Sequence, residues 1–143
     1  MADSDLAEFI DEYHAALDAF FRGDPEPAKK LYSHREDASL ANPFGPVAIG
    51  RQQVEATMER AAANYRDGAA TSFDTLATYV TQELAYLVEV ERFEAKVGSQ
   101  EDMASGALRA TSVIRPEDGG WKIVHRHADP ITAPRAAESV IQP

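Results

Sequence analysis

The chain contains no cysteine and few basic residues. Without cysteine there can be no disulfide, no thiolate nucleophile and no thiolate-bound zinc or iron–sulfur cluster. Lysine and arginine total 14 against 24 aspartates and glutamates, which gives a net charge of -10 over 143 residues. A surface this negative repels phosphate backbones, and no local basic stripe interrupts it. We therefore expect no nucleic-acid partner.

Long apolar runs and a basic leader are missing as well. No stretch approaches the length that spans a bilayer, and the first residues, MADSDLAEFIDEY, are acidic. We therefore expect a cytoplasmic protein that does not bind membranes. What is present is a globular composition, with 44% hydrophobic and 27% charged residues, in a chain long enough for one domain. We expect that domain over residues 1–130, with an extended tail over residues 131–143.

The first half of the chain carries helix signals. Apolar residues recur every three or four positions over residues 3–22, which predicts an amphipathic helix, and a short second helix is indicated over residues 24–32. The loop Asn42-Pro43-Phe44-Gly45-Pro46 interrupts helical structure because its prolines cannot continue it. A third helix follows, and its spacing places Met58 and Tyr65 on one face.

After residue 68 the apolar period changes from the helical spacing to two. Strands are predicted for four segments rich in β-branched and aromatic residues, at 71–81, 84–96, 104–115 and 121–129. Turn sequences between the last three segments indicate antiparallel hairpins. The predicted class is α+β, with three N-terminal helices packed on one face of a curved, mainly antiparallel sheet.

Two sequence segments carry a family resemblance. The segments DGGWKIVHRH at 118–127 and ANPFG at 41–45 are similar to SnoaL-like and ketosteroid-isomerase-like domains of the nuclear transport factor two-like superfamily. The resemblance covers roughly residues 5–130. It implies a cone-shaped fold with a pocket between the helices and the concave face of the sheet. A similar closing strand occurs in the association domain of calcium/calmodulin-dependent kinase II, which is an assembly module.

The same resemblance argues against ketosteroid isomerisation by its usual route. Asn42 stands where those isomerases have a carboxylate base, and Thr111 aligns near their protonated carboxylic acid. An amide cannot accept a proton from carbon at neutral pH, and a threonine is a weaker oxyanion donor than a carboxylic acid. Tyr13, on the inward face of the first helix, lies about one turn from their catalytic tyrosine. It is our candidate hydroxyl donor.

His125, His127 and Asp129 alternate along the last strand and must therefore point to the same side of the sheet. If that side is concave, His125 is the candidate general base, Asp129 orients it, and His127 holds the ligand. The structural alternative is a strand whose histidines only bond their neighbours. Two histidines and one carboxylate on one strand do not complete a metal site, so we predict no metal and no cofactor.

Basic and polar residues on the two preceding strands are candidates for ligand binding. Arg92, Arg109 and Thr111 are expected to face the pocket, where a guanidinium would bind an anionic small molecule. The alternative is exposed arginines paired with the many acidic residues. Glu89 and Glu91 are expected on the convex face.

The remaining pocket residues follow from the resemblance. Met58 and Tyr65 would form pocket walls, the alternative being that they are ordinary core residues. Phe44 would cover the mouth, and Asn42 would lie beside it. Trp121 is expected in the core or at an interface rather than in the ligand site.

A second copy of the chain is the expected protein partner. The convex face is predicted to carry Leu87, Phe93 and Val124, and apolar residues in such a place need cover. We therefore expect a homodimer through this face.

Two functions fit this pattern. The first is a SnoaL-like protein that binds a small, anionic or partly apolar molecule, either without turnover or as a cofactor-free lyase, isomerase or cyclase. The alternative is a non-catalytic dimeric ligand-binding or assembly domain similar to the kinase association domain.

Overall fold

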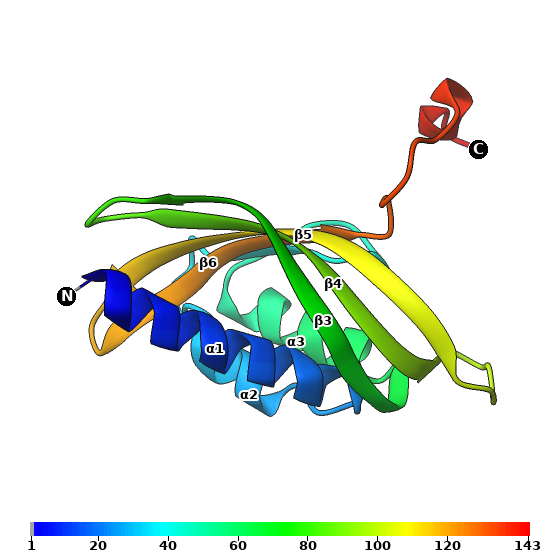
Figure 1. The fold of residues 1–143 in the computed structure, drawn as a ribbon, viewed down its shortest axis with the longest axis horizontal. Coiled ribbons are helices and arrows are strands. Elements are labelled where there is room, and N and C mark those ends of the chain that lie inside the picture. The colour runs from blue at the N-terminus through cyan, green and yellow to red at the C-terminus, as the bar shows by residue number, and fades with distance from the viewer. Residues whose placement is uncertain (1) are drawn as a thin grey trace.

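Three α-helices lie on one face of a six-stranded sheet (Figure 1). The computed structural model describes residues 2–143, with side chains from Asp5 onward. The helices are α1 (Ala2–Phe21), α2 (Glu26–Leu31) and α3 (Arg51–Ala62). The strands are β1 (Ser39–Ala41), β2 (Ala48–Ile49), β3 (Tyr65–Val80), β4 (Ala85–Val97), β5 (Ala104–Glu117) and β6 (Gly120–Asp129). The predicted α+β class is confirmed.

The strand order across the sheet is β2-β1-β6-β5-β4-β3. Only β1 and β6 run parallel, and every other neighbouring pair is antiparallel. The ladder between β3 and β4 shifts register at three places, and each shift adds bend and twist to the outer strand. The sheet is therefore curved, and its concave face covers the helices (Figure 1).

Helix α1 forms because its apolar residues line up on one side, and that side is buried against the sheet. The stripe comprises Leu6, Phe9, Tyr13, Ala16, Leu17 and Phe21, all buried. Gly23 ends the helix with a φ of 96°, which glycine adopts without strain. The amide of Gly23 bonds the Phe20 carbonyl and that of Asp24 bonds the Ala19 carbonyl, which is a Schellman cap.

The boundary between the third helix and the first long strand differs from the prediction. Helix α3 ends at Ala62, and Tyr65 is the first residue of β3, so this strand begins six residues before the predicted position 71. The Tyr65 side chain is buried, as the predicted helical spacing implied, but its backbone belongs to β3 and not to the helix. The apolar period of two was expected only after residue 68, whereas in the structure Gly68 is already part of β3.

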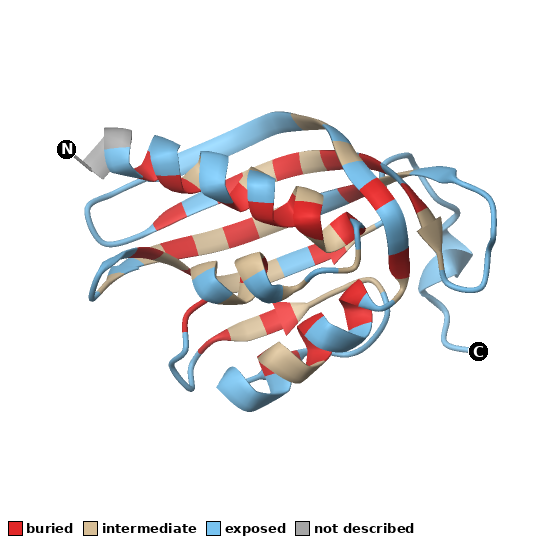
Figure 2. Cartoon of the chain, turned by 90° about the horizontal axis from the view of Figure 1, so that it is seen from below, coloured by how far each residue is buried: buried red, intermediate tan, exposed pale blue. Residues whose placement is uncertain are grey.

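The assignment of strand faces also needs correction. Figure 2 shows that buried and exposed positions alternate along the strands beneath the helices. Leu87 and Phe93 lie on the buried, concave side rather than the convex side. Val124 is an extra residue in β6 at a shift in the β5–β6 register, so its side chain belongs to neither regular row.

Residues 130–143 leave the sheet at the end of β6 and extend away from the body of the domain (Figure 1). This segment contains one short 3-10 helix at Ala137–Val140, and nearly all of its residues are exposed. Among the described helices, none combines the length and apolar character that crossing a membrane requires.

Close packing of α1 against β3 and β4 gives the first prediction. A methyl group on Gly68 would lie closer than 3.0 Å to the carbonyl oxygens of Phe21 and Glu94, which are backbone atoms that cannot rotate away. We expect Gly68→Ala to lower the free energy of unfolding by about 2 kcal/mol. Gly45→Ala is the control, because nothing lies within 4 Å of the added atom. Urea denaturation of both variants tests this, and equal stabilities would contradict it.

Candidate functional site

A narrow cavity lies between the helices and the concave face of the sheet. Its volume is about 50 Å³, and its walls are almost entirely apolar or aromatic. The aromatic members are Tyr13, Phe20, Phe21, Tyr32, Phe44 and Tyr65. Helix α1, the loop before β2, and strands β3, β5 and β6 each contribute lining residues, so the cavity depends on the packing of the whole domain.

Stacked aromatic rings fix the wall of the cavity at the end of α1. Phe21 stacks on Phe93 with ring centroids 4.3 Å apart, and Tyr65 meets both rings edge-on at 5.2 and 5.4 Å. Phe44 lies over Tyr65 at 5.8 Å. Phe44 is 49% exposed, so it stands between the cavity and the solvent.

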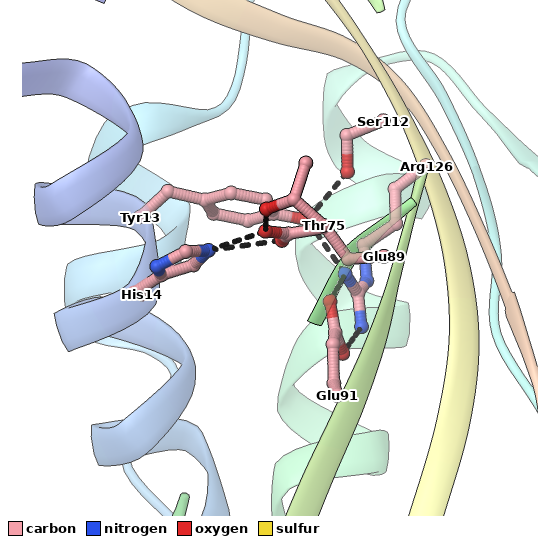
Figure 3. A network of polar contacts seen from close by, with 7 residues as sticks. All are labelled: Tyr13, His14, Thr75, Glu89, Glu91, Ser112 and Arg126. Carbon is pink, nitrogen blue, oxygen red and sulfur yellow. Dashed lines mark hydrogen bonds and ion pairs between the residues drawn. The ribbon is translucent and has the colours of Figure 1, made fainter. Parts of the chain in front are cut away.

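A buried ion pair crosses the concave face beside the cavity (Figure 3). The Arg126 guanidinium on β6 donates two hydrogen bonds of 2.6 and 2.7 Å to the Glu91 carboxylate on β4. It also donates to the Tyr13 hydroxyl on α1 at 2.6 Å. Tyr13 shares a further hydrogen bond of 2.7 Å with the Ser112 hydroxyl on β5. Four elements therefore meet at one set of polar contacts.

These contacts set the charge of each group. Burial alone would lower the pKa of Arg126, but the adjacent Glu91 carboxylate raises it well above its usual value, and the guanidinium stays charged. Burial raises the pKa of the Tyr13 hydroxyl, with Arg126 opposing the shift. Tyr13 is therefore protonated at neutral pH. The guanidinium beside the cavity, that of Arg126, is neutralised by the Glu91 carboxylate and is not free to bind an anionic molecule.

A second buried carboxylate lies two residues along β4. Both carboxylate oxygens of Glu89 lie 2.9 Å from His14 Nε2. One of them also accepts a hydrogen bond of 3.0 Å from the Thr75 hydroxyl (Figure 3). The His14 ring stacks on Phe73 at 3.9 Å. The prediction that Glu89 and Glu91 face the convex side is wrong, because both carboxylates are buried under α1.

The Tyr65 hydroxyl in the cavity has no hydrogen-bond partner among the described residues. Tyr65 is 4% exposed, yet no hydrogen bond to its hydroxyl is found among the described residues. Every fully buried polar side-chain atom in that part of the chain has a partner, so the Tyr65 hydroxyl is open to the cavity. Burial raises its pKa to about 12, so the group is a neutral donor and acceptor at physiological pH.

Five of the residues singled out in the sequence lie together in the cavity wall. They are Tyr13, Asn42, Phe44, Met58 and Tyr65. Asn42 lies at the mouth, where its side-chain oxygen accepts a hydrogen bond from the Phe44 amide at 2.8 Å.

The residues predicted on the last strand do not line the cavity. His125, His127 and Asp129 share one face, as the alternation requires, but that face is convex. The reason is the extra residue at Val124: before it the odd-numbered residues face inward, and after it the even-numbered Arg126 and Ala128 do. The orientation predicted for His125, His127 and Asp129 is therefore wrong.

On the convex face these residues bond their neighbours. His125 Nδ1 lies 2.7 Å from the Ser39 hydroxyl, and burial, followed by the nearby His127, lowers the pKa of its imidazole. Burial opposes ionisation of Asp129, but hydrogen bonds from Arg109, the Ile131 amide and His127 outweigh it and lower its pKa to about 2. Within the described residues, no three potential metal ligands are grouped.

Arg92, Arg109 and Thr111 also lie on the convex face, contrary to the prediction. Arg92 pairs with Asp74, and Arg109 with Asp129. The prediction placed the valines of β4 and β5 on the inward side because they are apolar. In the structure the valines face outward, and on β4 the glutamates face inward.

Arg126 is the site residue that the sequence analysis missed. Arg126 lies between His125 and His127 in the strand. Because neighbouring residues of a strand face opposite sides, the prediction that the histidines face inward placed Arg126 on the outward side. Charge in the sequence could have identified it. Glu89 and Glu91 lie on one face of β4, and Arg126 on β6 could neutralise a carboxylate there.

The sequence profile of the SnoaL-like domain matches residues 6–133. The chain belongs to the SnoaL-like domain family. The resemblance inferred from the closing strand and the Asn-Pro-Phe-Gly loop is therefore confirmed.

Solved structures show the same fold. A nuclear transport factor 2-like superfamily protein from Salmonella enterica subsp. enterica serovar Typhimurium str. LT2 aligns with a TM-score of 0.78 at 20% identity, covering 96% of each chain. A ketosteroid isomerase-like protein from Erwinia carotovora atroseptica SCRI1043 aligns at 0.68 and 13% identity, covering 92% of this chain and 95% of its own. A candidate calcium/calmodulin-dependent protein kinase type II association domain from Thiobacillus denitrificans ATCC 25259 aligns at 0.65 and 18% identity, covering 87% and 93%.

These identities establish the nuclear transport factor two-like fold of this SnoaL-like domain and no activity. No curated protein matches the chain significantly.

The buried ion pair gives the second prediction. Arg126→Met leaves the Glu91 charge buried without a partner, so we expect the free energy of unfolding to fall by about 3–5 kcal/mol. Adding Glu91→Leu should restore most of it. Arg109→Met, which removes an exposed pair, should cost about 1 kcal/mol or less. Equal losses for Arg126→Met and Arg109→Met in urea denaturation would show that the buried pair has no special role.

Proposed function

We propose that this SnoaL-like domain binds a small, mainly apolar molecule that carries one polar group, and that it does so in the cavity beside Arg126. The observation that carries the proposal is the Tyr65 hydroxyl, which bonds no described residue and lies in a mainly apolar cavity. The hydroxyl is accessible from the cavity and bonds no described residue, so a ligand carbonyl or hydroxyl could take it as a hydrogen-bond partner without breaking a contact within the protein.

The size of the cavity limits the ligand. A volume of about 50 Å³ is less than the liquid volume of two water molecules, at about 30 Å³ each, which suits the end of a chain. A larger ligand has to displace Phe44, whose ring covers the mouth and is half exposed. A narrow, flexible chain therefore fits the cavity better than a rigid ring system.

Binding without turnover is better supported than a lyase, isomerase or cyclase activity. Proton abstraction from carbon needs a base, and the described lining residues include no carboxylate and no imidazole. Tyr13 and Tyr65 both have raised pKa values, so they act as neutral hydroxyl groups at physiological pH. Of the three predicted catalytic residues only Tyr13 lines the cavity, where its hydroxyl is already bonded to Arg126 and Ser112.

The neutral ketone 2-hexanone tests the binding proposal. We expect it to bind wild-type protein, with affinity reduced about fivefold in Tyr65→Phe because one neutral hydrogen bond is lost. Tyr79→Phe, which removes an exposed hydroxyl on the convex face, is the matched control. Two-dimensional NMR titration measures the affinity and shows which residues respond.

A cavity-filling variant shows where the ketone binds. Ala128→Leu fills space in the wall and should abolish binding while the protein remains folded. Binding of 2-hexanone that survives Ala128→Leu, or that perturbs only residues outside the cavity, would contradict the proposal.

The second candidate is a dimeric assembly module, and the convex face supports it. Val88, Val90 and Val113 form an apolar centre there, only half-buried in the single chain. Tyr79 and Tyr86 stack at one side of it with ring centroids 5.8 Å apart. Apolar residues grouped on an open sheet face favour a second copy as the partner. This residue set replaces the one predicted from sequence.

A charge at the centre of this face tests the dimer. We expect wild-type protein to be dimeric, and Val88→Glu to weaken association at least about tenfold because it buries a charge in the interface. Val47→Glu places the same charge on an exposed loop residue elsewhere and serves as the control. Sedimentation velocity over a range of concentrations measures both, and a wild-type protein that is monomeric throughout would refute the dimer.

A further inference from the structure

A second, larger hollow adjoins the cavity outside Phe44. It lies between the loop that precedes β2 and the exposed side of α3, with a volume of about 710 Å³. Asn42, Phe44 and Ala61 belong to the walls of both spaces. Phe44 therefore separates an apolar interior from an open groove, and a molecule that passes it occupies both.

The groove differs from the rest of this acidic protein in its charge. The chain has 24 carboxylate side chains against 14 basic ones. Yet none of the described residues that line the groove is acidic, and one of them is Arg60.

Arg60 has no carboxylate partner among the described residues. Its recorded side-chain hydrogen bond is donated by Nη2 to the neutral Thr57 hydroxyl, at 3.1 Å. By contrast, Arg51 on the same helix pairs with Glu55 at 3.2 Å. Arg60 therefore presents a positive charge to the groove without an internal counter-charge.

The side-chain amides of the groove add hydrogen-bond donors. The Asn42 oxygen accepts from the Phe44 amide at 2.8 Å, and the Gln53 oxygen accepts from the Ile49 amide at 3.1 Å. These contacts fix the orientation of both side chains, because a backbone N–H must face the oxygen. Each NH₂ group is left to donate elsewhere. A guanidinium and amide donors, with no nearby carboxylate, are suited to an anion.

We propose that the groove binds the carboxylate of a ligand whose apolar part enters the cavity past Phe44. Arg60 is the anchor, and the Asn42 and Gln53 amides donate to the same group. The inference rests on the proposed function and specifies its ligand class, a small amphipathic acid. The sequence analysis expected an anionic ligand bound by Arg92, Arg109 and the histidines. The proposed anchor for such a ligand is instead Arg60 on α3. The local field of Arg60, rather than the net charge of the protein, attracts it.

A pair of probes that differ only at one end tests the anchor. In 5-oxohexanoate a carboxylate replaces the terminal methyl group of 2-hexanone, and the ketone end is the same. We expect 5-oxohexanoate to bind wild-type protein about tenfold more tightly, because a charged hydrogen-bonded pair is added. This preference should shrink as salt is raised, since Arg60 is exposed.

Variants on one helix separate the anchor from general charge effects. Arg60→Gln should remove the preference for 5-oxohexanoate and leave the affinity for 2-hexanone unchanged, while Arg60→Lys should retain part of it. Arg51→Gln makes the same change of charge two and a half turns earlier on α3 and should have no effect. Both residues changed, Arg60 and Arg51, are exposed on the surface of the helix, so all three variants are expected to fold. Circular dichroism checks this before each titration.

The outcomes distinguish this inference from the proposed function. If 2-hexanone binds in the cavity but 5-oxohexanoate binds no better, or if Arg60→Gln keeps the preference, the groove is not an anion site and the cavity proposal stands. In that case the role of Arg60 is to stabilise the last turn of α3, where it donates a hydrogen bond to the Thr57 hydroxyl. If neither probe binds, both proposals are wrong.

Discussion

The buried pair of Arg126 and Glu91 holds together the elements on which the cavity depends. It joins β6 to β4 across the concave face, and through the Tyr13 and Ser112 hydroxyls it also ties in α1 and β5. Both charges are removed from water, with side-chain exposures of 11% and 1%, so neither can lose its partner without a large loss of stability. The pair therefore fixes where α1 lies, and α1 supplies one wall of the cavity.

This pairing also determines what the cavity can do. The guanidinium is neutralised internally, and the Tyr13 hydroxyl is shared between Arg126 and Ser112. What is left for a ligand is an aromatic wall and the Tyr65 hydroxyl. The positive charge that is available to a ligand lies outside Phe44, on Arg60. In the proposed site, the apolar cavity would therefore select the apolar part of a ligand, and the adjoining groove would select its charge.

The two faces of the sheet have different tasks. The concave face buries Glu89, Glu91 and Arg126 under α1, where each has a charged or hydrogen-bonded partner. The convex face carries valines at its centre and ion pairs such as Arg109–Asp129. Apolar residues on both faces are usual for a sheet covered on both sides, and the proposed dimer would supply the second cover.

Residue order by itself determined the class, the helices and the family. The stripe from Leu6 to Phe21 specifies α1 because three- and four-residue spacing produces one apolar face, and the closing strand and the Asn-Pro-Phe-Gly loop identify the SnoaL-like domain. Tyr13, Phe44 and Tyr65 were found as cavity residues because family resemblance and aromatic character both pointed inward.

Only the tertiary structure decided which side of each strand is buried. Alternation shows that His125 and His127 share a face, but it does not say which face, and the extra residue at Val124 exchanges the two sides within one strand. Whether a charge has a partner is likewise invisible in the sequence, because Glu91 meets Arg126 from 35 residues away. Arg60 follows Glu59 directly in the sequence, yet among the described residues it has no carboxylate partner. Pairing between distant segments, rather than local pattern, placed the charges of this protein.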